Sequence, residues 1–320
     1  MFLITLLKEK NALLIKTGMF IAEYIWLDSE NKFRSKTKVC KEITSWNFDG
    51  SSTGQSEVKK SELILNPVFK CPNPFRYVSG FDCVLILCDV WEDDHTPHFT
   101  NSRAANIELF EYFKNEKPMF GFEQEFFLKL PKDNENHYCK TNTIEERSCV
   151  DDILNACLRA KLSITGMNAE VASHQWEIQV CDYGIEAADQ LIILRYIIEF
   201  ISIKYNFKFI LHPKPSKTCN GSGCHINFST EKIRNCEWNT EEVMDKFKKT
   251  HKKHIDVYGD KNELRLTGTN ETCDINCFKW GYKDRTASIR CNHTYFEDRR
   301  PSSNVDPYIA CAKILDTLYS

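Results

Sequence analysis

The stretch Gly121-Phe122-Glu123-Gln124-Glu125-Phe126 places two glutamates one residue apart among aromatic residues. Residues 119–130 predict a strand, because the segment is rich in Phe and Leu with polar residues spaced along it. Side chains alternate along a strand, so Glu123 and Glu125 are expected to project from the same face. Carboxylates this close repel unless a cation lies beside them, and their oxygens suit hard divalent ions. The pair is half of a candidate Mg²⁺ or Mn²⁺ site, and the alternative is two solvated glutamates on an edge strand.

A second predicted strand, residues 224–229, also has one polar face. His225, Asn227 and Ser229 share that face, and the residues between them are apolar. The polar face is expected to meet a ligand and the apolar face the core, although a lone histidine on a strand is more often simply hydrogen-bonded. Three more segments carry candidate ligands: Asn-Ala-Glu at 168–170, Gln-Trp-Glu-Ile-Gln at 175–179, and Tyr-Phe-Glu-Asp-Arg-Arg-Pro at 295–301.

Taken in this order, the motifs resemble those of glutamine synthetases of the short eukaryotic type. The resemblance covers nearly the whole chain, from about residue 22 to residue 307, and chance agreement at so many ordered places is not credible. The segments that carry it are 46–52, 122–125, 168–171, 175–177, 223–225, 265–268, 285–290 and 295–301. Two departures stand out: Cys181-Asp182 replaces the usual Gly-Pro, and the loop before Tyr295 is short, leaving His293 as the candidate for a basic residue there.

The alternation of predicted strands and helices along the chain favours an α+β protein with an antiparallel or mixed sheet and helices on one side. Predicted strands include 22–27, 62–65 and 82–91, and predicted helices are 103–114, 150–160, 188–205 and 240–258, the last capped by Asn239 or Thr240. The resemblance implies a small N-terminal β-grasp domain over 19–97 and a larger catalytic domain over 98–320, with a mostly antiparallel sheet flanked by helices. Residues 1–18 are an extension, either a short amphipathic helix or a leader without structure.

The resemblance also implies the ligands of the metals and of the nucleotide. Glu125, Glu170 and Glu177 would hold one divalent ion, and Glu123, His225 and Glu297 a second. Two or three Mg²⁺ or Mn²⁺ ions are expected per site, with ATP as co-substrate. The residues implied to meet the nucleotide are Asn227, Ser229, Arg290 and Tyr295.

The remaining implied roles concern glutamate, ammonia and the transferred phosphoryl group. Arginines suit carboxylate and phosphoryl oxygens because their donors lie in a planar fork. By resemblance, Arg265 binds the α-carboxylate of glutamate and Arg285 faces the phosphoryl group, while Asp49 takes a proton from ammonium and Glu271 shields the intermediate. The other residues implied to bind substrate are Asn220, Gly221, Arg299, Tyr138 and Ser52.

Composition sets limits on the class of protein. The 320 residues are 42% hydrophobic and 27% charged, as in ordinary globular chains, and a net charge of −3 gives no footprint for nucleic acid. No apolar run approaches the length of a membrane span. Fifteen cysteines, an odd number with scattered spacing, argue against a disulfide framework. We therefore expect reduced, mostly buried thiols in a cytoplasmic protein.

The function implied by the resemblance is the ATP-dependent joining of ammonia to the γ-carboxylate of L-glutamate through a γ-glutamyl phosphate. Its partners would be L-glutamate, ammonium and ATP, and copies of the same chain in two stacked pentameric rings, a decamer. Two alternatives remain: a non-catalytic structural protein on the same fold, and a γ-glutamylamine ligase that accepts a larger amine.

Overall fold

The computed structural model describes residues 18–133, 135–141, 144–217, 219–269 and 272–320. Contacts between residues divide the chain into two compact units. The first extends to Asn101, slightly beyond the predicted boundary at residue 97, and also includes Arg159–Lys161. The second holds the rest of the chain, and the predicted extension falls almost wholly outside the described residues.

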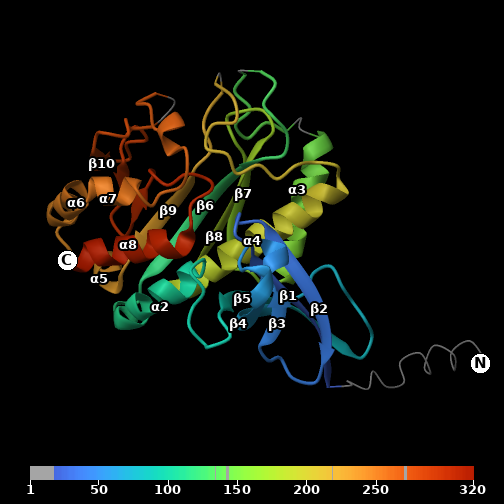
Figure 1. Cartoon of the computed structure of the whole chain (residues 1–320). Coiled ribbons are helices and arrows are strands. Elements are labelled where there is room, and N and C mark those ends of the chain that lie inside the picture. Colours follow the sequence, from blue (N-terminus) through green and yellow to red (C-terminus); the bar gives the residue numbers. More distant parts are fainter. Residues whose placement is uncertain (1–17, 134, 142–143, 218, 270–271) are drawn as a thin grey trace, which may run out of the picture. The chain divides into compact units, whose positions relative to one another are not determined.

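The first unit is built on a five-stranded sheet (Figure 1). Its strands, in spatial order β2-β1-β5-β4-β3, are β2 (Phe33–Cys40), β1 (Met19–Leu27), β5 (Phe81–Trp91), β4 (Glu62–Pro72) and β3 (Trp46–Asp49). The central pair β1 and β5 is parallel, and the other neighbours are antiparallel. Every second residue of β1 and β5 enters one apolar core, as the two-residue period of strands requires.

Asp49 is the last residue of β3 and leads into a tight turn. The Asp49 carboxylate caps the short helix η1 (Gly50–Thr53) by accepting from the Ser51 N–H, and Gly54 ends that helix in the left-handed conformation with a φ of 70°. The hydroxyls of Ser51 and Ser52 donate to the same carboxylate over 2.6 and 2.7 Å. These hydrogen bonds lower the pKa of Asp49 to about 2, so it is a carboxylate at neutral pH.

The second unit contains a seven-stranded sheet, antiparallel except for its first pair. In spatial order its strands are β10 (Trp280–Tyr282), β11 (Ile289–Cys291), β12 (Phe296–Asp298), β9 (Cys224–Ser229), β6 (Met119–Phe127), β8 (Gln175–Tyr183) and β7 (Ile164–Ala169). Chain segments far apart in sequence thus meet at the centre, where β6 lies between β8 and β9. The predicted α+β class and the three motif-bearing strands are confirmed.

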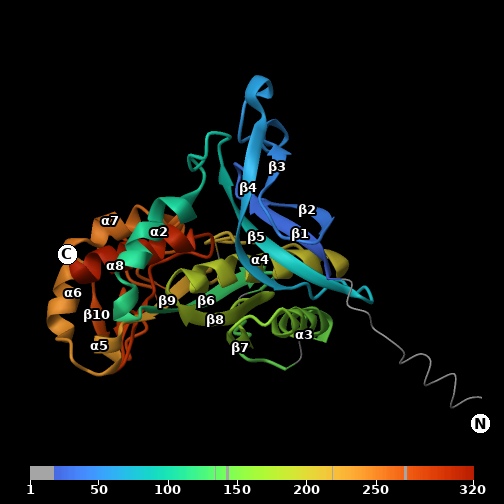
Figure 2. The same ribbon diagram turned by 90° about the horizontal axis from the view of Figure 1, so that it is seen from below.

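The helices of the second unit are α2 (Ser102–Tyr112), α3 (Ile144–Arg159), α4 (Gly184–Lys204), α5 (Glu231–Arg234), α6 (Thr240–Lys249), α7 (His251–Ile255) and α8 (Pro307–Tyr319). Among them, α4 packs along one face of the sheet against β6 and β8 (Figure 2). Short 3₁₀ turns are η2 (Val58–Lys60), η3 (Lys114–Glu116) and η4 (Asn262–Leu264).

Two predicted boundaries are wrong for local reasons. The helix predicted over 240–258 starts as expected, with Asn239 as its cap, but it is interrupted at Thr250. The Thr250 hydroxyl donates to the Lys246 carbonyl over 2.8 Å, a side-chain bond that competes with the helix ladder. In the other case α3 begins at Ile144 rather than at residue 150, because its first turn is polar and lacks the apolar period used for prediction.

Alternation along β6 separates the helix-covered face from the face with the glutamates. Gln124 is fully buried under α4, where its side-chain oxygen accepts from Nε of Arg195 over 2.7 Å. Arg195 also donates to the carbonyls of Ser303 and Val305, so this buried guanidinium is satisfied on three sides. Glu123 and Glu125 consequently project from the opposite face of the sheet. Within the described residues, no helix has the length and apolar character needed to cross a membrane.

Candidate active site

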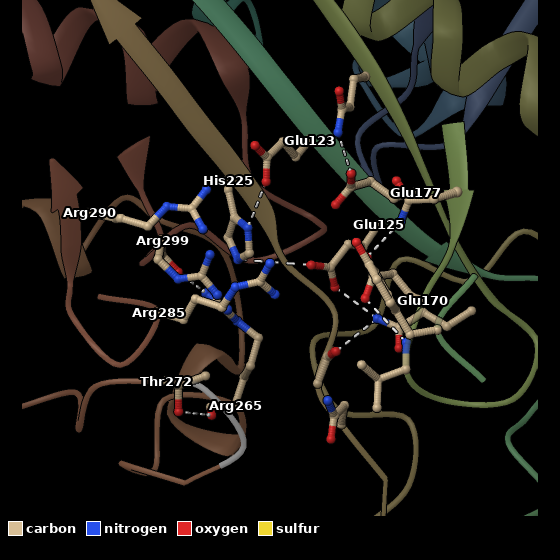
Figure 3. A pocket seen from close by; sticks show the side chains of 17 residues that line it. Glu123, Glu125, Glu170, Glu177, His225, Arg265, Thr272, Arg285, Arg290 and Arg299 are labelled. Atoms are coloured by element: carbon tan, nitrogen blue, oxygen red, sulfur yellow. Dashed lines mark hydrogen bonds and ion pairs between the residues drawn. The ribbon is translucent and has the colours of Figure 1, made fainter. Parts of the chain in front are cut away.

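Three glutamates from adjacent strands meet on the open face of the sheet. Glu125 on β6 lies opposite Glu177 on β8, and Glu170 follows β7. Each is oriented by neighbours: Glu125 Oε2 accepts from Gly223 N–H and from Gln175 over 2.9 and 2.8 Å. Asn168 and Gln179 donate to Glu170 and Glu177 over 2.9 and 2.7 Å. All three glutamates line a cavity of about 190 Å³ (Figure 3).

We call Glu125, Glu170 and Glu177 the first acidic group. A second acidic group, made of Glu123, His225 and Glu297, lies beside it. Ligand atoms of Glu123, His225 and Glu297 all lie within 4.8 Å of one another, on β6, β9 and β12. His225 Nδ1 is 3.2 Å from Glu123 and 3.6 Å from Glu297. Asn227, on the same face of β9 as His225, donates to Glu123 over 2.8 Å. The sheet register therefore brings together Glu123 and His225, which are 102 residues apart in the sequence, and sets Glu297 on the next strand beside them.

Burial and neighbouring charges shift the pKa values of Glu125, Glu177 and His225. Burial, followed by repulsion from Glu170 and Glu177, raises the pKa of Glu125 well above its usual value. Burial, followed by the charge of Glu123, raises the pKa of Glu177 to about 8. Burial also lowers the pKa of His225 well below its usual value, which favours the neutral, ligating form of imidazole. Oxygen-rich, mutually repelling carboxylates beside a neutral histidine fit a divalent cation such as Mg²⁺ or Mn²⁺.

Arginines face the glutamates across the same cavity, as Figure 3 shows. They are Arg265, Arg285, Arg290 and Arg299. Arg299 donates to Glu297 over 2.6 Å, and Arg290 contacts the other oxygen of that carboxylate. Glu297 is fully buried. A cation at the second acidic group would therefore share the Glu297 carboxylate with these two guanidinium groups. The cavity thus has an acidic wall suited to cations and a basic wall suited to carboxylate or phosphoryl oxygens.

Two glycines make room for this wall. A Cβ added to Gly221 would lie 2.4 Å from Arg265 Cγ and 2.8 Å from the Pro213 carbonyl, which is a clash. A Cβ on Gly223 would lie 2.9 Å from His225 Nε2. The Arg265 guanidinium passes over this backbone and shares Nη2 hydrogens among the carbonyls of residues 299–301. Its orientation is therefore fixed before any ligand binds.

A larger cavity of about 550 Å³ adjoins the first, with Glu123 and Gln179 common to both. Its walls include three of the residues predicted to meet the nucleotide: Asn227, Ser229 and Tyr295. Arg290, the fourth, lines the smaller cavity instead.

Comparison with known proteins gives the same family as the motifs. The family model for the catalytic domain of glutamine synthetase matches residues 102–252. The glutamine synthetase of Kluyveromyces lactis is 39% identical over 97% of this chain and 91% of its own length. Those of Eremothecium gossypii and Neurospora crassa are also 39% identical, over 98% and 95% of this chain and 94% and 93% of their own lengths. The chain belongs to the glutamine synthetase family.

Most of the residues implied by the glutamine synthetase resemblance meet at these two cavities. Tyr138, Asn220 and Gly221 line the smaller one with the arginines and glutamates. Asp49 and Ser52 lie in the first unit, where they hydrogen-bond to each other, and their roles stay predictions. The proposed shielding residue, Glu271, falls outside the described residues.

His293, the candidate for the basic residue that the glutamine synthetase pattern carries before Tyr295, is not among the residues that line the two cavities described above. Its ring lies 5.9 Å from that of Tyr282, in a separate small cavity lined also by Cys236 and Trp238. The hairpin between β11 and β12 is closed tightly by a hydrogen bond from Asn292 N–H to the Tyr295 carbonyl, and this turn directs His293 away from the larger cavity.

Several lining residues received no individual role from the sequence. Gln175 and Gln179 share a face of β8 with Glu177, so the two-residue period that identified the glutamates also contains the signal for them. Cys181, two residues further along that face, lines the larger cavity of this glutamine synthetase homologue. Thr272 carries no such signal, because it lies in an irregular loop.

Proposed function

We propose that this member of the glutamine synthetase family joins ammonia to the γ-carboxylate of L-glutamate, using ATP and releasing ADP and phosphate. The observation that carries the proposal is the smaller cavity, where two acidic groups face four arginines. Glutamate, ammonium and the phosphates of ATP are charged, and the cavity offers charges of both signs at short range. The relatives named above, all glutamine synthetases of similar length, support the same activity.

Two or three divalent ions, Mg²⁺ or Mn²⁺, would be held by the two acidic groups. Bound there, such ions would neutralise phosphoryl oxygens and so favour phosphoryl transfer. The nucleotide would occupy the larger cavity, beside Asn227, Ser229 and Tyr295, with its phosphates directed toward Arg290. Glu123 borders both cavities, so the phosphates and the acidic groups would meet at their junction.

The other side chains would hold and orient glutamate. Arg265 would bind the α-carboxylate, because its side chain passes over Gly221 and its guanidinium is held by the Arg300 carbonyl, while Asn220 and Gly221 line the same cavity. Arg299 would then lie toward the γ-carboxyl end and Arg285 toward the phosphoryl group that is transferred. Fixed donors of this kind lower the barrier because they need no reorganisation when charge develops.

The reaction proceeds in two steps. A γ-carboxylate oxygen of glutamate attacks the γ-phosphorus of ATP, and the bond to the ADP oxygen breaks, giving an acyl phosphate. Neutral ammonia then attacks the acyl carbon, and phosphate leaves with the C–O bonding electrons. Asp49 would attract ammonium and accept its proton, although its low pKa makes the first role the stronger one. Glu271 would exclude water from the acyl phosphate.

The experiment that tests this function is an assay of purified protein with ATP, glutamate and a panel of amines. We expect glutamine to form with ammonia and no comparable product with larger amines. A preference for a bulky amine would instead favour a γ-glutamylamine ligase. Lack of any product at saturating Mn²⁺ would favour a non-catalytic structural role. The presence of all six proposed metal ligands argues against that role.

We also propose that the chain assembles into rings in which Asp49 serves the acidic groups of a neighbouring copy. The support is the family resemblance together with the location of Asp49 in the first unit, whereas all six proposed metal ligands lie in the second. Mixing Asp49→Ala subunits with Glu297→Ala subunits tests it. Each variant is expected to be inactive alone, and mixed rings should regain activity at interfaces that combine an intact Asp49 with an intact Glu297. Mixed assemblies confirmed by mass that remain inactive would contradict the shared site.

We propose a cytoplasmic location, on the basis of the thiols. All fifteen cysteines are free, and eight of them are buried. Burial raises the pKa of Cys71 and of Cys224 to about 12, which makes both unreactive. Thiol titration under denaturing, non-reducing conditions should recover nearly all fifteen. Recovery of only a few would mean disulfides or a tightly bound metal, and would point to another compartment.

A further inference from the structure

The β7–β8 turn carries Glu170 and leads into Gln175 and Glu177, so its position decides the geometry of the first acidic group. Gln175 is the central link: its amide donates both to Glu125 and to the Gly221 carbonyl, over 2.8 and 2.9 Å. Any contact that holds Gln175 in place therefore also positions its amide against the Glu125 carboxylate and against the loop under Arg265.

A buried carboxylate on α3 binds the residues on both sides of Gln175. Glu146 is only 4% exposed. One of its oxygens contacts Nδ1 of His174, and the other accepts from the indole N–H of Trp176 over 3.3 Å. Trp176 is 1% exposed and pairs with Phe126 on β6. Side chains alternate along a strand, so Trp176 faces α3 while Gln175 and Glu177 face the cavity.

His174 needs such an anchor. Its backbone lies in the left-handed region, with a φ of 65°, which is unfavourable for a residue with a Cβ. Within the described residues, Nε2 of its ring is buried without a hydrogen-bond partner, so the ring is held through Nδ1 by Glu146. Its carbonyl accepts from Leu128 N–H over 3.0 Å, which ties the turn to the end of β6.

We infer that Glu146 is a positioning residue for the first acidic group: it fixes His174 and Trp176 from behind and so sets Gln175 and Glu177 in front. It lies on the far side of the strand, and its hydrogen bonds within the described part of the chain go to none of the residues that we assign to a metal or substrate. The inference rests on the proposed function, because it assumes that Glu125, Glu170 and Glu177 bind a cation.

The test is Mn²⁺ binding by folded, purified protein, followed by the electron paramagnetic resonance of free Mn²⁺ without substrates. Glu146→Ala is expected to weaken binding roughly 10–100-fold, as loss of outer-sphere support usually does. Glu146→Gln should bind nearly as the unmodified protein does, because its oxygen can accept from Trp176 and its amide can donate to a neutral His174. His174→Ala, which removes one of the two contacts, should have an intermediate effect.

A core variant separates positioning from general loss of stability. Met244 on α6 is fully buried away from the turn, so Met244→Ala should lower the melting temperature without changing Mn²⁺ affinity. In assays, Glu146→Ala should need more Mn²⁺ yet recover much of its kcat when Mn²⁺ is saturating.

Unchanged Mn²⁺ affinity in folded Glu146→Ala and His174→Ala, or an equal loss in Met244→Ala, would overturn the inference. Failure of the proposed function would look different, because the unmodified protein would then bind no Mn²⁺ and make no glutamine.

Discussion

Replacing Glu125 or Glu177 with alanine is expected to abolish ATP-dependent glutamine formation and to weaken Mn²⁺ binding. Either change removes one of the three carboxylates that would hold a divalent ion. Stabilisation of transition-state charge by a metal amounts to several kcal/mol, so the expected loss of rate is roughly 10³-fold or more. The measurements are initial rates of glutamine formation and titration of free Mn²⁺.

Glu125→Gln distinguishes charge from shape. Its amide oxygen can still accept the bond that Gly223 N–H makes to Glu125 Oε2, so the sheet and loop should keep their positions. We expect the same loss of Mn²⁺ affinity as in Glu125→Ala. A matched control is Glu111→Ala on α2, which removes an exposed carboxylate paired with Lys114 and should leave activity intact.

Thermal denaturation gives an independent measurement. A ligand that binds only the folded state raises the melting temperature, so Mn²⁺ should stabilise the unmodified protein and the Glu111→Ala control. The shift should vanish or shrink in the Glu125 and Glu177 variants. Unchanged metal affinity in either alanine variant would refute the assignment of that glutamate, whatever happened to activity.

The acidic groups were predictable from sequence because strands have a simple period. Glu123 with Glu125, and His225 with Asn227, each obey the alternation that also places their neighbours in the core. Pairing of β6 with β8 and β9 was not predictable from periodicity, and the family resemblance supplied the grouping. The structure adds the register, which sets Glu125 opposite Glu177 and Glu123 opposite His225.

Residues that position the site without lining the cavity could not be identified from the sequence. Glu146 lies in a polar first turn that periodicity did not assign to a helix, and nothing local relates it to His174, 28 residues away. The interruption of the helix at Thr250 coincides with one hydrogen bond, from the Thr250 hydroxyl to the Lys246 carbonyl. Side-chain hydrogen bonds of this kind are decided by tertiary packing rather than by helix propensity, and so a single sequence does not reveal them.

The run Glu297-Asp298-Arg299-Arg300, which begins in β12 and continues just past its end, contains one case of each kind. Glu297 and Arg299 belong to the cavity side, where they are ion-paired. Asp298 and Arg300 alternate with them and lie on the core side, 0% and 1% exposed. The sequence motif drew attention to Arg299, whereas the buried ion pair beside it became visible only in the structure.

Replacing Asp298 with alanine is expected to destabilise the second unit strongly. Both Asp298 oxygens accept from Arg300, over 2.9 and 2.6 Å, and Oδ2 also accepts from the Tyr258 hydroxyl over 2.7 Å. The network continues from Tyr258 to His254 and on to Thr317 in α8. Loss of the carboxylate would leave a buried guanidinium without its counter-charge and a buried phenol without its acceptor.

The expected cost is about 3–5 kcal/mol, typical for removing one partner of a buried ion pair. For a domain of this size that corresponds to a fall in melting temperature of roughly 6–20 °C. Calorimetry of the purified variant measures it, and the midpoint of urea denaturation provides a second value. Glutamine formation should also fall, because Glu297 and Arg299 are the neighbours of Asp298 along the chain.

The double variant Asp298→Ala/Arg300→Met decides whether the uncompensated charge is the cause. Methionine fills part of the volume of the Arg300 side chain among the rings of Phe247, Tyr258 and Phe278, and it leaves no buried charge. Because replacing both partners of a buried pair with apolar groups is usually far milder than removing one, the double variant should be more stable than Asp298→Ala alone. If it is instead less stable, the two losses add, and the ion pair contributes through its hydrogen bonds to Tyr258 and His251 rather than through mutual neutralisation.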